Sequence, residues 1–258
     1  MNMKDVKAIT IPEGSVKKIE DSNGNIIWGN PTDFPYRRLE YIHFNGADNY
    51  MNTTIPPAGG RNYAVYLKAD STQKSNPRVL GSYDSSAADA GRRVYLMTDG
   101  NNRNVRWTFG SNWSSWMTVG NYANKKIKLD MTISADRKTA YCGVRDPDTN
   151  DVITNTTITT GTAIGQSSKL AIGTNLNNSG GIDTNVMWAG NVYLMEVRSG
   201  GAGGSLWCNF IPVQRKSDGK LGFINTVNKR FFALEGTQNS ANIGPTADEY
   251  WDLTDPFN

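Results

Sequence analysis

The fold class is clearest in the stretch Lys126-Ile127-Lys128-Leu129-Asp130-Met131-Thr132-Ile133, where polar and apolar side chains alternate from end to end. Successive side chains of a β-strand point to opposite faces of a sheet, so this alternation predicts a strand with one face in a core and the other in water. Similar runs recur on both sides of it, separated by clusters of Gly, Asn, Asp and Ser. They cover residues 39–44, 63–69, 78–83, 92–97, 104–109, 126–134, 139–144, 152–158, 169–172, 191–197, 206–212, 221–225 and 230–233.

This series of runs, with no convincing helical stretch among them, predicts an all-β protein built from two packed antiparallel sheets. The composition agrees with that prediction, because 20% charged residues, 38% hydrophobic residues and 26 Gly are typical of many short strands joined by polar turns. No fixed-period repeat is visible, which argues against a propeller or a solenoid.

The sequence is expected to divide into four parts. Residues 1–29 are predicted to form a small N-terminal β module, because strand-like runs at 6–11, 15–20 and 25–28 are joined by turn residues. Two prolines mark residues 30–35 as a linker. Residues 36–236 form the predicted sandwich. Residues 237–258 form an irregular tail whose large apolar side chains predict docking on its own domain or on a neighbour.

Two segments carry a resemblance to known families. The stretch 189–197, followed by Phe210-Ile211-Pro212 and Arg215-Lys216-Ser217-Asp218-Gly219, resembles the closing strands of concanavalin A-like (LamG-type) domains of phage and prophage proteins. Leu39-Glu40-Tyr41-Ile42 resembles their opening strand. Residues 4–28 are similar to an N-terminal module of structural proteins of gut-bacterial phages. The resemblance implies a concanavalin A-like jelly-roll β-sandwich preceded by a small N-terminal β module.

The same resemblance implies a structural or accessory component of a bacteriophage virion, such as a head fibre, a capsid decoration or a tail appendage, made in the host bacterial cytoplasm. Residues 1–29 would contact other virion proteins, because so small a sheet buries too little apolar surface to be stable alone. The residues expected to make this contact are Val6, Ile9, Ile11, Val16, Ile19, Ile26 and Trp28. A homo-oligomer is expected, since such appendages commonly have closed symmetry, and a trimer is assumed.

An alternative is an adhesin that binds a glycan of the host cell surface. Exposed indole rings stack on the apolar faces of sugars while polar neighbours bind the hydroxyls. The candidate glycan-binding residues are Trp113, Trp116, Asn112 and Ser115. Trp107 and Phe109 are spaced to face one way into the core, and Trp113 and Trp116 packing on a hairpin remains the other interpretation.

No catalytic residue is predicted. Glucanases on this fold need two carboxylates that project from one strand, whereas Glu196 stands alone on its strand. His43 is the single histidine, and the alternation places it on one face with Leu39 and Tyr41, which indicates a structural role. A glycan-degrading enzyme is therefore the least favoured of the three functions.

No cofactor is predicted either. The cysteines Cys142 and Cys208 are expected to be buried thiols, and a disulfide between them is the less favoured alternative. A loop calcium ion is left open as an alternative to aspartates that cap turns. The aspartates concerned are Asp84, Asp89, Asp99 and Asp183.

Nucleic-acid binding and membrane insertion are not expected. The formal net charge is +3 and the cations are scattered along the chain, unlike the basic stripe of a nucleic-acid binder. No run approaches the roughly 18 consecutive apolar residues of a membrane-spanning helix, and the first residues lack the pattern of a secretory signal.

Overall fold

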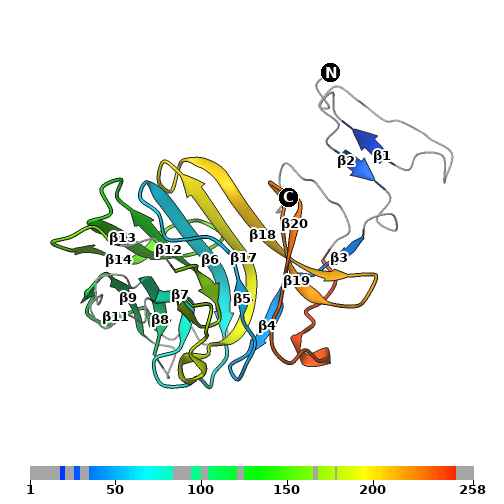
Figure 1. Cartoon of the computed structure of the whole chain (residues 1–258), viewed down its shortest axis with the longest axis horizontal. Helices are drawn as coiled ribbons and strands as arrows, with labels where there is room; N and C mark the ends of the chain where they lie inside the picture. The colour runs from blue at the N-terminus through cyan, green and yellow to red at the C-terminus, as the bar shows by residue number, and fades with distance from the viewer. Residues whose placement is uncertain are drawn as a thin grey trace.

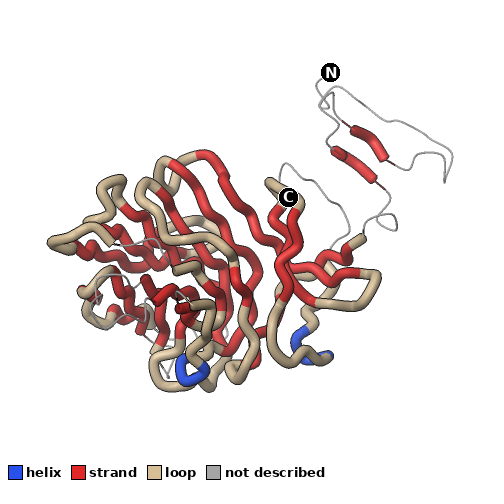
Figure 2. Tube along the Cα trace, in the orientation of Figure 1, coloured by secondary structure: helices blue, strands red, loops and turns tan. Residues whose placement is uncertain are grey.

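The computed structural model describes residues 18–20, 26–29, 35–83, 94–99, 104–120, 125–164, 168–177 and 179–247. Two large sheets form a sandwich, and a two-stranded sheet lies nearer the N-terminus in the sequence (Figure 1). Within these described ranges, helix is confined to two short 3-10 turns, η4 (Thr184–Val186) and η5 (Ser240–Asn242), as Figure 2 shows. The predicted all-β fold with two packed sheets is confirmed.

The larger sheet has ten strands, and every pairing within it is antiparallel. Its order is β14-β13-β12-β6-β17-β18-β19-β20, with β3 paired to β18 and β4 paired to β17. The bounds are β3 (Tyr36–Arg38), β4 (Ile42–Asn45), β6 (Arg61–Ala69), β12 (Lys126–Ile133), β13 (Thr139–Arg145), β14 (Val152–Thr159), β17 (Ala189–Ser199), β18 (Ser205–Arg215), β19 (Leu221–Asn225) and β20 (Arg230–Ala233).

The smaller sheet has eight strands in the order β10-β9-β8-β7-β15-β5, with β11 paired to β9 and β16 paired in parallel to β7. The bounds are β5 (Met51–Asn52), β7 (Arg78–Tyr83), β8 (Val94–Thr98), β9 (Asn104–Phe109), β10 (Asn112–Trp113), β11 (Met117–Thr118), β15 (Ala171–Ile172) and β16 (Asn175–Asn177).

The two-stranded sheet pairs β1 (Lys18–Glu20) with β2 (Ile26–Gly29) in antiparallel fashion. Its backbone register matches Lys18 with Gly29 and Ile19 with Trp28. The strand expected over residues 6–11 lies outside the described residues.

The main core lies between the two sandwich sheets. In β12, Ile127, Leu129, Met131 and Ile133 are all buried, which is the face that the alternation predicts. Facing side chains of both sheets complete this core, and the burial of each large one contributes roughly 1.5–3 kcal/mol. The largest fully buried side chains are Trp107, Trp188, Tyr63, Phe44, Phe109, Phe210 and Phe223.

A second apolar cluster covers part of the opposite, outer face of the ten-stranded sheet. It consists of Leu194, Ile211, Val213 and Ile224, with Tyr36, Tyr66 and Phe231 packed against it. Part of this sheet is therefore covered by apolar side chains on both faces.

Residues 236–247, here called the strap, run along β4. Gly236 begins the strap with φ +86°, and a Cβ at this position would lie 2.3 Å from the carbonyl oxygen of Asp48, so this backbone path requires glycine. The carboxylate of Asp48 accepts hydrogen bonds from the N–H of Thr237 at 2.9 Å and from its hydroxyl at 2.7 Å. The strap thus fixes the late part of the chain to an early strand.

No helix in the described residues has the length and apolar character needed to cross a membrane.

Candidate functional site

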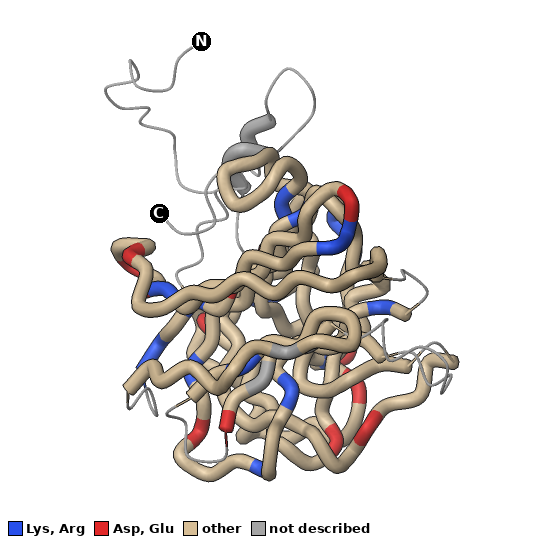
Figure 3. The backbone as a smooth tube through the Cα atoms, turned by 90° about the vertical axis from the view of Figure 1, so that its left-hand side faces the viewer, with Lys and Arg blue, Asp and Glu red and all other residues tan. Residues whose placement is uncertain are grey.

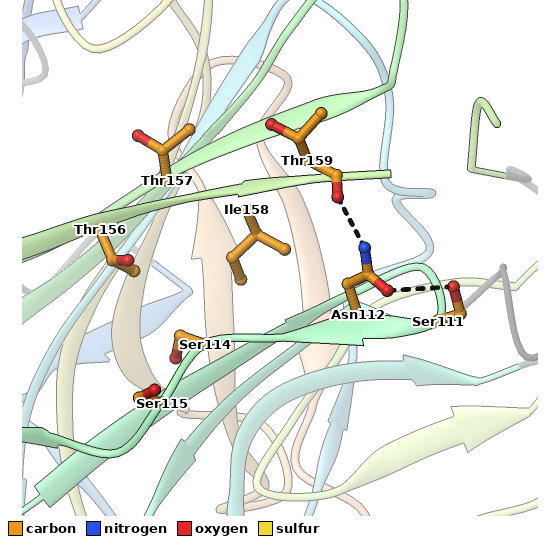
Figure 4. A pocket seen from close by; sticks show the side chains of 8 residues that line it. All are labelled: Ser111, Asn112, Ser114, Ser115, Thr156, Thr157, Ile158 and Thr159. Atoms are coloured by element: carbon orange, nitrogen blue, oxygen red, sulfur yellow. Dashed lines mark hydrogen bonds between the residues drawn. The ribbon is translucent and has the colours of Figure 1, made fainter. Parts of the chain in front are cut away.

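A groove of about 480 Å³ lies between β10, at the end of the smaller sheet, and β14, at the end of the larger one. We call it the edge groove (Figure 4). It is lined by Ser111, Asn112, Ser114, Ser115, Thr156, Thr157, Ile158 and Thr159.

The lower wall of the edge groove comes from a tight hairpin between β9 and β10. Gly110 supplies the positive φ of +65° that this turn needs. Beyond β10, Ser114 donates its N–H to the carbonyl of Trp107 at 3.0 Å, and its hydroxyl accepts from the N–H of Trp107 at 3.2 Å. These bonds bury Ser114 and leave Asn112 and Ser115 exposed.

One end of the edge groove is closed by a hydrogen bond between the two sheets. The side-chain amide of Asn112 donates to the carbonyl oxygen of Thr159 at 2.6 Å. The hydroxyl of Ser111 donates to the other side of the same amide at 3.4 Å. Asn112 is thereby oriented from both sides.

The upper wall of the edge groove comes from β14. Figure 4 shows the side chains of Thr156 and Ile158 pointing from β14 toward β10, while those of Thr157 and Thr159 point away. Ile158 is only 5% exposed and forms the apolar part of this wall. No lining side chain is charged, and hydroxyl and amide groups both donate and accept hydrogen bonds. This chemistry suits a neutral ligand rich in hydroxyls.

Of the four predicted glycan-binding residues, the structure brings two into the lining of the edge groove. Asn112 and Ser115 line the edge groove. Trp116, the residue after Ser115, is 37% exposed, and the guanidinium of Arg106 lies 5.5 Å from its ring centre. Trp113 belongs to β10, but its side chain is outside the described part. Trp107, expected in the core, is 1% exposed, which confirms that expectation.

The residues of β14 were not predicted as part of a site. The run 152–158 was recognised only as a strand, because a local pattern does not reveal which strands end the two sheets. The one available signal was its composition, since Val152–Thr159 contains no charged residue and four threonines.

Glu196 is the single carboxylate of β17, as the sequence indicates, but a carboxylate of another strand lies near it on the outer face of the ten-stranded sheet. Asp130 on β12 and Glu196 on β17 both pair in register with Ala64 of β6, so the two carboxylates flank one small residue. A pattern within a single strand cannot reveal this pair, because it forms across three strands.

Both carboxylates are bonded and nearly inaccessible. Asp130 is 4% exposed and lies 3.3 Å from the Nε of Arg145, and Glu196 is 8% exposed and lies 2.9 Å from a guanidinium nitrogen of Arg198. Burial raises the pKa of Asp130, against the opposing charge of Arg145. The polar face of β12 was expected to lie in water. This expectation is wrong at Asp130, because neighbouring cations cover its carboxylate.

The prediction that His43 shares a face with Leu39 is wrong, whereas Tyr41 is half-buried like His43. Leu39 is 1% exposed, whereas the side chain of His43 is 23% exposed, because the strand pattern breaks after Arg38 and β4 begins only at Ile42. The Nδ1 of His43 lies 2.9 Å from the side-chain oxygen of Asn191, and its Nε2 lies 3.5 Å from a carboxylate oxygen of Asp70.

The remaining expected sites are mostly bonded within turns or lie outside the described residues. The carboxylate of Asp99 accepts from Asn104, and that of Asp183 accepts from the N–H of Asn185. Within the described ranges no three His, Cys, Asp or Glu side chains are grouped to hold a metal ion. Cys142 and Cys208 are free and buried.

Four of the seven residues expected to attach the protein to a virion are outside the described ranges. Val6, Ile9, Ile11 and Val16, like the aspartates Asp84 and Asp89, lie outside the described residues. For Ile19, Ile26 and Trp28 only the backbone is described.

No protein-family model matches the sequence, and the search of curated proteins gives no significant match. Several solved structures are similar in fold. A putative carbohydrate-binding protein from Bacteroides ovatus has a TM-score of 0.49 and 11% identity, over 81% of this chain and 62% of that one. A heptameric SAP-like pentraxin from Limulus polyphemus has a TM-score of 0.45 and 11% identity, over 62% of this chain and 76% of that one.

A tailspike protein from a bacteriophage of Escherichia coli O157:H7 is also similar in fold. It has a TM-score of 0.39 and 10% identity, over 56% of this chain and 20% of that one. At such identities the likenesses concern the fold alone.

Proposed function

We propose that this protein is a non-enzymatic component of a bacteriophage virion that binds neutral polysaccharide of the host surface in the edge groove. The observation that carries the binding proposal is the lining of this groove, which offers hydroxyl, amide and backbone groups and no charge. Its volume of about 480 Å³ falls in the range of small-molecule sites.

The absence of charge in the lining favours a neutral ligand. A carboxylated or phosphorylated sugar would lose water on entering the groove and would find no cation in the lining to replace it. Because none of the lining side chains titrates in the ordinary pH range, affinity is expected to stay constant from about pH 5 to pH 8. Trp116 adds an exposed aromatic ring next to the lining residue Ser115.

Binding is tested with the full chain on a glycan array and on whole host cells. Thr156→Val removes a hydroxyl at nearly constant shape, and Ser115→Ala removes a second one. Each lost hydrogen bond is worth about 1 kcal/mol, so the double variant should bind roughly 30-fold more weakly. Trp116→Ala should also weaken binding.

The matched control is Trp207→Ala, because Trp207 is 39% exposed and lies on β18, outside the groove lining. This variant should bind as the wild type does. Absence of any glycan ligand, or a double variant that binds as tightly as the wild type, contradicts the assignment.

The virion part of the proposal is supported by the resemblance of residues 4–28 to a module of phage structural proteins. In this proposal residues 1–29 attach the protein to a capsid or tail protein and residues 30–35 are a linker. Residues 36–236 display the sandwich, and residues 237–258 form a docked tail. Deletion of residues 1–35 should abolish incorporation into particles and leave the circular dichroism of the sandwich unchanged. Incorporation of the truncated protein at wild-type levels contradicts this part.

Glycan hydrolysis is the weaker candidate, and the pair Asp130 and Glu196 is the one observation that favours it. Both carboxylates are buried beneath cations, whereas hydrolysis requires that they reach the glycosidic bond. Incubation with a bound polysaccharide should release no reducing ends. Release that is lost in Glu196→Gln would instead establish an enzyme.

A further inference from the structure

The strands that end the two sandwich sheets differ in length and chemistry. β5 and β10 have two residues each and β20 has four, whereas β14 has eight. Soluble proteins commonly shield sheet edges with charged side chains, proline or very short strands. β14 contains neither charged residues nor proline, so it is a long edge without these protections.

Among the residues that the structure describes, the backbone groups on the outer side of β14 have no partner at Asn155 and Thr157. Thr160 donates its N–H to the carbonyl of Lys138 on the β13 side at 2.7 Å. Because N–H and C=O groups alternate sides along an antiparallel strand, those of Asn155 and Thr157 point away from β13. The carbonyl of Thr159 is already bonded to β10, and a bulge interrupts the start of the strand. Asn155 and Thr157 therefore form the regular part of the open edge.

Exposed apolar side chains gather at the same edge. Tyr141 on β13 is 54% exposed, and Val152 and Ile153 on β14 are each 46% exposed. Figure 3 views the molecule from the side on which Figure 1 shows β13 and β14, and long stretches of its tube carry no charged residue. Covering these side chains would add apolar burial to backbone pairing.

We propose that β14 pairs in antiparallel fashion with β14 of a second copy of this chain, about a two-fold axis at Thr156. This centre places Asn155 of each copy opposite Thr157 of the other. The open backbone groups of both copies are then satisfied by about four hydrogen bonds.

Charge complementarity favours a second copy as the occupant. The β13–β14 turn carries Asp146, Asp148 and Asp151. The turn before β13 carries Arg137 and Lys138 beside Asp136, whose carboxylate accepts hydrogen bonds from the hydroxyl of Ser134 and the N–H of Lys138. An antiparallel two-fold arrangement brings the acidic turn of each copy toward the basic turn of the other. The contact is two-fold and so differs from the assumed trimer. It goes beyond the proposed function and does not depend on a ligand.

Disulfide trapping in the full chain tests both the contact and its register. In the proposed register Thr156 lies opposite Thr156 of the second copy, with Cα atoms about 4.5 Å apart, so Thr156→Cys should give a covalent dimer under mild oxidation. Thr154→Cys is the matched control, because the two copies of residue 154 would be about 13 Å apart. The native Cys142 and Cys208 are buried and should not interfere.

Sedimentation of the untrapped protein gives a second readout that needs no ligand. Ile153→Lys should abolish the dimer, whereas Val227→Lys, at a residue that is 51% exposed and lies outside β14, should not. Lys138→Glu should weaken the dimer, and adding Asp151→Lys should restore it.

A wild-type chain that sediments as a monomer at every concentration overturns the proposal. Equal trapping of the two cysteine variants overturns it as well. A variant that loses glycan binding but still dimerises separates this inference from the proposed function. A variant that loses the dimer but still binds glycan separates them as well.

Discussion

Replacement of Asn242 by Ala is expected to lower the free energy of unfolding by about 3 kcal/mol. The side chain is 1% exposed and makes three hydrogen bonds within the strap region. Its amide donates to the carbonyl of His43 and to the side-chain oxygen of Asn49, both at 2.8 Å, and its oxygen accepts from the N–H of Asn239 at 2.8 Å. Each such bond contributes about 1 kcal/mol net, and the buried side-chain oxygen of Asn49 would lose this donor.

Urea unfolding followed by tryptophan fluorescence measures this loss. For a slope of about 3 kcal/mol per M urea, a loss of about 3 kcal/mol lowers the midpoint by roughly 1 M. Asn228→Ala is the control, because Asn228 is exposed and its side chain accepts one hydrogen bond, from the N–H of Arg230. A midpoint of Asn242→Ala equal to that of the wild type, or an equal loss in the control, would show that the strap does not stabilise the sandwich.

Three further predictions concern titration. The ion pair with Arg215 lowers the pKa of Asp218 to about 2, so its stabilisation is present above the ordinary pKa near 4 and is lost as the pH falls toward 2. NMR titration of the carboxyl carbon should place its midpoint near 2, and a midpoint near 4 would exclude the pair. Burial raises the pKa of Asp130, so the folded protein binds the proton of this carboxyl more tightly than the unfolded chain does. The stability that this proton contributes is fully present below pH 4 and is lost as the pH rises through the raised pKa. Asp130→Asn should therefore gain stability relative to the wild type from pH 4 to pH 7, and urea midpoints that keep a constant difference would contradict this. Burial raises the pKa of Cys142 well above its ordinary value, so this thiol should react with a disulfide reagent only after unfolding, and rapid reaction in the native protein would contradict its burial.

The long strands were predictable because alternation is visible over four or more residues. The runs 78–83, 104–109, 221–225 and 230–233 coincide with β7, β9, β19 and β20. The short strands β3, β5, β10, β11 and β16 were not predicted, since two or three residues show no period. The break after Arg38 was missed for a related reason, because it interrupts a run that alternates in sequence.

The edge groove could be predicted on one side only. Asn112 and Ser115 were recognised because tryptophans lie next to them in the sequence. The opposing wall at Thr156 depends on the order of strands, which is set by the packing of the two whole sheets. The pair of Asp130 and Glu196 depends on register across β6 and was missed for the same reason.

The strap also has a consequence for the folding pathway. Asn242 bonds to the carbonyl of a residue 199 positions earlier in the chain. Closing contacts over such separations slows folding, because the entropy of a very long loop is lost before the contact forms. During synthesis β4 is made early but cannot acquire this cover until residue 242 has left the ribosome. The nascent chain therefore keeps that early strand incompletely covered, and it completes its native structure only after nearly the whole sandwich has been translated.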